Sequence, residues 1–161
     1  MTQTPNSLRR ALFAEHEYLD GLFNRLLQCV HQNDREALSQ LWTVFEQVIR
    51  DHIGWEEAHL LPRYRLEQPD DAASIDADHA RFRELIAEIG VAVDLHLIRE
   101  DIVREMIDLL RSHARREEEQ SHAWADENVK GPAAESLLQK VLARMRDAKD
   151  ATGAGGPSIL R

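Results

Sequence analysis

The sequence is poor in cysteine and has no long apolar run. Cys29 is the only cysteine among 161 residues, so a disulfide within the chain is excluded, and so are zinc ribbons and iron–sulfur clusters built on several thiolates. No stretch approaches the roughly 18 apolar residues that a transmembrane helix needs. The first residues, MTQTPNSLRR, also lack the apolar segment of a signal peptide. We therefore expect a cytoplasmic protein that does not enter a membrane.

Glycine and proline are also scarce, with seven and five residues. Few chain breakers favour long helices over short strands joined by many turns. The length is that of one domain, large enough to bury an apolar core without cross-links. The formal net charge is −9, and the basic residues are scattered among acidic ones. Clustered lysine and arginine lead the binding of phosphate backbones, so a nucleic-acid partner is not expected.

Apolar residues recur at spacings of three and four in four successive segments, the pattern of amphipathic helices. Thr4 before Pro5 predicts an N-cap and a first helical position, for a helix that runs to about His31. Asn33 with Glu36 resembles a capping box, and it opens a second helix that should end near Pro62.

The remaining segments follow the same rule. Pro69, Asp70 and Asp71 predict a turn before a third helix, which should end near residues 96–99. A fourth helix should run on to Gly131 and Pro132, and a shorter fifth helix from there to about residue 147. We predict an all-α fold: an up-down-up-down four-helix bundle with a short C-terminal helix over residues 1–147, and a flexible tail over 148–161.

Polar side chains interrupt the apolar stripe of each of the four long helices. They are histidines and glutamates: His16; His52 with Glu56; His79; and His113 with Glu117. Both HxxxE pairs have i, i+4 spacing, so their two side chains share a helix face. Buried without counter-charge, such a set would cost several kcal/mol in desolvation, which a pair of metal ions offsets. Imidazole and carboxylate donors without thiolate suit iron and tolerate zinc, manganese or copper.

The order H…HxxxE…H…HxxxE, with HIGWEEAHLLP around the second histidine, resembles the hemerythrin, or HHE cation-binding, family over about residues 8–128. The resemblance implies a bridged di-iron centre. His16 and His52 would hold one iron, His79 and His113 the other, and Glu56 with Glu117 would bridge them.

This resemblance also implies a function. It predicts a protein that binds or reacts with O2, NO or peroxide in sensing, scavenging or iron handling. We expect a binding protein more than an enzyme, with peroxidase-like or oxidase-like side reactions at most. The alternative is a regulatory or interaction module in which one structural metal, such as zinc, pins the helices without redox chemistry. The pattern identifies no protein partner.

The sequence departs from oxygen-carrying hemerythrins at two places. They have a second histidine four residues after the position of His79, where this chain has Arg83, and an arginine cannot coordinate a cation. Their last motif is HxxxxD, whereas both Glu117 and Glu118 follow His113 here. Helix phase favours Glu117, about 40° around from His113, over Glu118, about 140° around. The second iron is then one ligand short, and either keeps an open position or recruits a substitute.

Four further residues are candidates to support or replace a ligand: Arg83, Glu118, Glu57 and His59. His59 lies two turns beyond His52, where a packed histidine at a helix end is the favoured interpretation. His122 is nine residues past His113, half a turn around a continuous helix, so we expect its side chain in solvent.

Overall fold

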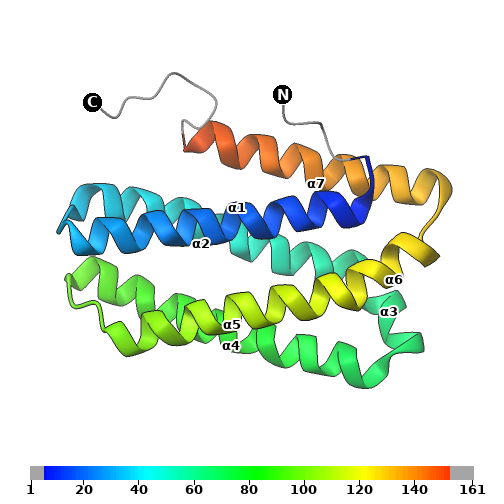
Figure 1. Ribbon diagram of the computed structural model, residues 1–161, viewed down its shortest axis with the longest axis horizontal. Coiled ribbons are helices and arrows are strands. Elements are labelled where there is room, and N and C mark those ends of the chain that lie inside the picture. The colour runs from blue at the N-terminus through cyan, green and yellow to red at the C-terminus, as the bar shows by residue number, and fades with distance from the viewer. Residues whose placement is uncertain (1–5, 153–161) are drawn as a thin grey trace.

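A computed structural model describes residues 6–152 of the chain, and in that range all regular elements are helices (Figure 1). Seven helices are present: α1 (Leu8–His31), α2 (Arg35–His59), α3 (Leu61–Glu67), α4 (Pro69–Leu95), α5 (Glu100–Glu119), α6 (Ser121–Asn128) and α7 (Gly131–Ala151).

The four long helices α1, α2, α4 and α5 alternate in direction and form the bundle that the sequence predicts (Figure 1). The short helices α3 and α6 contact each other at one end of it, and α7 lies outside along α1 and α2. The predicted all-α class and the additional C-terminal helix are thus confirmed. Among residues 6–152, no helix is long and apolar enough to cross a membrane.

The predicted apolar stripes form the core. On α2 and α4 every residue of the stripe is buried, including the polar members His52, Glu56 and His79. The main apolar core surrounds Phe45, and a second one packs α7 against the start of α1. The buried histidines and glutamates lie between these two cores, so apolar side chains flank the polar layer at both ends.

Helix starts differ from the prediction by a few residues. Helix α1 is capped by Ser7, whose Oγ accepts the Arg10 N–H at 3.3 Å; Thr4 and Pro5 lie outside the described residues. Helix α2 is capped by Asp34 and not by Asn33, because Asn33 adopts the left-handed conformation (φ 54°) that ends α1. The Asp34 N–H donates to the Cys29 carbonyl at 2.9 Å, which closes a Schellman motif.

The second helix ends at His59, close to the predicted end near Pro62, but a short helix, α3, follows it directly. The prediction of one continuous helix that runs to Gly131 is wrong. Pro62 does not end the helical path: it lies in the first turn of α3, where its missing N–H leaves no bond unmade. Pro69 likewise begins α4, and no separate turn precedes it. At the other site the backbone of Gln120 leaves the helical region (φ −118°, ψ −80°) and separates α5 from α6.

Helix α7 is one turn longer than predicted. Residues 148–151, assigned to the flexible tail, are helical, and Ala148 is buried. The Tyr18 hydroxyl of α1 donates to the Ala148 carbonyl at 3.1 Å, which ties the end of α7 to the bundle. The rest of the predicted tail, residues 153–161, lies outside the described part of the chain.

Candidate metal centre

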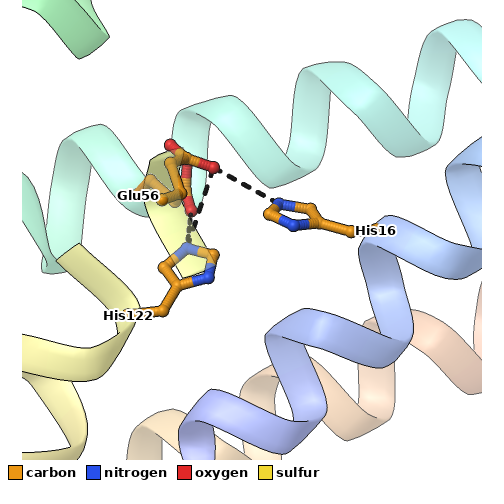
Figure 2. Close-up of side chains that lie close together, drawn as sticks. His16, Glu56 and His122 are labelled. Carbon is orange, nitrogen blue, oxygen red and sulfur yellow. Dashed lines mark hydrogen bonds and ion pairs between the residues drawn. The ribbon is translucent and has the colours of Figure 1, made fainter. Parts of the chain in front are cut away.

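Five imidazoles and two carboxylates meet in the polar layer. They come from α1, α2, α4, α5 and α6 and are all buried: His16, His52, Glu56, His79, His113, Glu117 and His122. Figure 2 shows the rings of His16, on α1, and His122, on α6, pointing toward the carboxylate of Glu56, on α2. The His122 Nε2 lies 2.7 Å from Glu56 Oε1.

The donor atoms form two overlapping groups. In the first, one donor atom each from His16, Glu56, Glu117 and His122 lie within 4.8 Å of one another. In the second, the same holds for Glu56, His79, His113 and Glu117. Both groups contain both carboxylates. Each group is compact enough for one metal ion, so the carboxylates stand where they can touch two ions at once.

His52 belongs beside the first group. Its Nε2 is 3.1 Å from the Nε2 of His16 and 3.4 Å from Glu56 Oε1. Two imidazole nitrogens at this separation are about as far apart as neighbouring ligands of one ion with bonds of about 2.1 Å. The first group therefore has three imidazoles available, and the second has two.

The outer nitrogen of four of the five rings is bonded to a carboxylate. The Nδ1–H groups donate as follows: His16 to Glu118 (3.0 Å), His52 to Glu15, His79 to Glu57 (3.2 Å) and His113 to Asp78 (3.0 Å). A neutral imidazole that donates through Nδ1 keeps its lone pair on Nε2. These bonds therefore turn the coordinating nitrogen of each ring toward the centre, as in metal sites of known proteins.

Three of these carboxylates are held in turn by arginine. Arg144 of α7 bonds both oxygens of Glu15, at 2.9 and 2.7 Å. Arg83 bonds both oxygens of Glu57, at 2.9 and 2.7 Å.

The third pair joins Arg116 to Asp78, and the same arginine donates to Ser74 Oγ at 2.9 Å. Each arginine fixes a carboxylate that would otherwise rotate. The outer surface of the centre is thus built from paired charges.

The charges inside the layer depend on one another. Burial lowers the pKa of His79, but the nearby carboxylates of Glu117 and Glu56 outweigh burial and raise that pKa to about 9. Burial and the charge of Glu117 raise the pKa of Glu56, but the charge of His52 and the contacts with His122 and His79 prevail and lower it to about 2. Carboxylates here are held ionised, and they attract positive charge, whether protons or metal ions.

In the other histidines and in Glu117, the effect of burial on the pKa is likewise opposed by the charges of neighbouring groups. Burial opposes the charged form in each, yet Glu117 raises the pKa values of His16 and His113, and Glu56 and Glu15 raise that of His52. The pKa of Glu117 is lowered, against burial, chiefly by His113.

Several buried donor atoms at the centre lack a hydrogen-bond partner among the described residues. They are Oε2 of Glu56, Oε2 of Glu117, and Nε2 of His79 and His113. A buried polar atom without a partner costs about 1–3 kcal/mol, and native proteins keep few of them. All four atoms face the centre, so a cation among them would satisfy the set at once. The residues present therefore fit a metal pair bound by nitrogen and oxygen.

The structure brings the six predicted ligands together. The four candidates for a supporting role differ in their distance from the centre. Glu117 points into the centre and Glu118 toward the outer face of His16, as helix phase indicates. Glu57 supports His79, and Arg83 supports Glu57 without reaching the centre. His59 is exposed at the end of α2, where its ring lies 5.8 Å from that of Trp55, so it is not among the donors.

Asp78, beside His113, and two fully buried residues at the centre were not found from the sequence. The expectation that His122 is solvated is wrong: its side chain is fully buried. The break at Gln120 changes the phase between α5 and α6, so nine residues no longer place His122 half a turn from His113. Glu15 is the second, a 1% exposed carboxylate next to His16 in the chain. Only its arginine partner, 129 residues away, distinguishes it from a surface acid.

Comparison with known proteins gives one family. The model of the hemerythrin HHE cation-binding domain matches residues 7–125, which include all seven donors and end before α7. No curated protein and no solved structure matches the chain significantly.

Proposed function

Because the chain belongs to the hemerythrin HHE cation-binding domain family, we propose that its buried centre holds two iron ions and that the protein binds or reacts with a small ligand such as O2, NO or peroxide. His16, His52 and His122 would hold one ion, and His79 with His113 the other. Glu56 and Glu117 would contact both. The bound iron would supply electron exchange and a coordination position for the ligand.

The observation that carries this proposal is the sharing of both carboxylates by two compact donor groups. One tetrahedral ion would leave several of the seven buried donors unsatisfied. Two ions with shared carboxylates use them all. Iron is favoured because the donors are imidazole and carboxylate without sulfur, although zinc and manganese accept the same donors.

The two halves of the centre are unequal, and this supports ligand binding at one of them. Three imidazoles stand on the His16 side and two on the His79 side. His122, which the sequence analysis placed in solvent, adds an imidazole on the His16 side, so the His79 side gains no substitute for the missing histidine. The ion held by His79 and His113 would then keep a free position for a small ligand.

Elemental analysis of protein purified without an affinity tag tests the proposal, together with its visible spectrum before and after reduction by dithionite. We expect two ions per chain and an absorption that dithionite removes. Glu56→Ala and Glu117→Ala should each lose most of the metal, whereas Glu118→Ala, which alters only the outer contact of His16, should keep most of it. One ion or fewer in fully loaded protein would count against a dinuclear centre.

A structural metal is the second candidate. The centre lies between the two apolar cores, so an ion there would also join α1, α2, α4 and α5 in one layer. In that case the loaded protein is colourless and indifferent to dithionite, and chelation lowers the cooperativity of unfolding without any redox change.

A further inference from the structure

A cavity of about 480 Å³ opens between α1 and α5 and reaches the metal centre. Its rim is formed by exposed residues of these two helices, among them Glu17, Gly21, Arg111 and Arg115. Buried side chains form its floor, including the rings of His16, His52 and His113. The cavity is thus a route from the surface to the candidate metal ligands.

The apolar part of the floor is one layer of the bundle. Leu19 and Phe82 lie three residues after His16 and His79, and Ile49 and Leu110 lie three residues before His52 and His113. Neighbouring helices of the bundle are antiparallel (Figure 1). Residues three after a histidine on α1 or α4, and three before a histidine on α2 or α5, therefore lie on the same side of the imidazoles. Glu56 and Glu117 lie one turn away on the opposite side. A molecule in the cavity would therefore approach the centre from the face without the shared carboxylates.

The size of the cavity decides between small and larger ligands. A cavity of about 150 Å³ with aliphatic walls is enough for benzene. Pockets for organic ligands begin near 300 Å³. At about 480 Å³ the cavity is far larger than a diatomic ligand requires, and its lining combines charged residues at the rim with the apolar layer of Leu19, Ile49, Phe82 and Leu110. An organic molecule with an apolar body of several carbon atoms fits it.

The charge at the deep end of the cavity determines which head group a ligand should carry. Two divalent ions would exceed the charge of Glu56 and Glu117, and two of the three acids that line the cavity are already bonded, Glu118 to His16 and Asp20 to Arg111 (3.1 Å). A single negative group would be favoured there. It is also the kind of donor that an open coordination position accepts, and His113, which would hold the ion with the free position, lines the cavity.

We infer that this cavity binds a small monocarboxylate with an apolar body, its head group at the metal centre and its body against the layer of Leu19, Ile49, Phe82 and Leu110. This inference rests on the proposed metal centre and names the class of ligand that the centre admits.

Calorimetric titration of the metal-loaded protein with acetate, butyrate and hexanoate tests the inference, with azide as a ligand that needs no apolar wall. Each fully buried methylene strengthens binding about fourfold. Because the cavity is open on one side, we expect hexanoate to bind at least about tenfold more tightly than acetate. Metal-free protein should lose binding of all these anions.

A matched pair of variants distinguishes the contribution of the cavity to ligand binding from the contribution of the metal. A Cβ atom added at Gly21, on the rim, meets nothing within 4 Å, and the same holds for Gly54, which does not line the cavity. Gly21→Trp should fill the entrance and reduce hexanoate binding about tenfold while leaving azide binding unchanged. Gly54→Trp should leave the affinities for both ligands unchanged.

The two proposals fail differently. Equal affinities for acetate and hexanoate in a metal-loaded protein that binds azide would overturn the monocarboxylate site alone, as would an unchanged hexanoate affinity in Gly21→Trp. A protein that takes up no metal would overturn both.

Discussion

Arg144, on the last helix, bonds both oxygens of the buried Glu15 carboxylate, and Glu15 in turn accepts a hydrogen bond from His52 Nδ1. The arginine also stacks over the Trp55 ring at 5.4 Å. A helix beyond the matched family region thus contacts a candidate metal ligand through one carboxylate.

Arg144→Met should weaken both the fold and metal binding. It leaves a 1% exposed carboxylate without its arginine, which costs about 3 kcal/mol in the free energy of unfolding. The freed Glu15 would also hold His52 less firmly, so metal affinity should fall about tenfold or more. Urea unfolding and metal titration measure the two effects. Arg65→Met, which breaks the exposed pair with Asp76, is the control and should change neither much.

His122→Ala should lower the affinity for one of the two ions, since the His16 side loses one of three imidazoles. Metal analysis at limiting metal should fall toward one ion per chain. His59→Ala removes an exposed histidine of the same chemistry and should keep two. Equal metal content in the two variants would show that His122 is only a packed core residue.

Arg83→Leu should speed the loss of metal while changing the free energy of unfolding only a little. The Arg83 side chain is 44% exposed, so losing its pair with Glu57 should cost less than about 1 kcal/mol of unfolding free energy. Glu57 would nonetheless be freer to leave His79 Nδ1, and metal should dissociate several-fold faster to a competing chelator. Arg81→Leu is the matched control on α4, because Arg81 pairs with Glu84 and Glu105 away from the centre. The same dissociation rate in both variants would exclude a role for the Glu57 contact.

Tyr64→Phe should change the response of stability to alkaline pH. Burial and the hydrogen bond to Asp71 (2.7 Å) raise the pKa of the Tyr64 phenol above its ordinary value of 10. Above pH 10 the unfolded chain therefore releases this proton before the folded protein does, and the stability contributed by the protonated phenol declines as pH rises. The difference between the unfolding free energies of the two proteins should be constant below about pH 10 and shrink as the pH rises above it, and a difference that stays constant there would contradict the assignment.

The sequence predicts the fold and the six inward residues because both follow from helix periodicity. Leu12, His16 and Leu19 share a stripe whatever the rest of the chain does. Helix periodicity does not predict the burial of His122, since its position depends on the backbone at one residue, Gln120. Helix periodicity does not predict the role of Glu15 either, because its burial requires a partner on α7 that no local pattern identifies.

The link from His52 through Glu15 to Arg144 also concerns the order of biosynthesis. The bundle residues and all candidate ligands leave the ribosome before α7, yet the arginine that neutralises Glu15 is the last part of the centre to be made. A nascent chain that ends before residue 144 would carry the histidines but not this clamp. We therefore expect stable metal loading to follow the synthesis of α7.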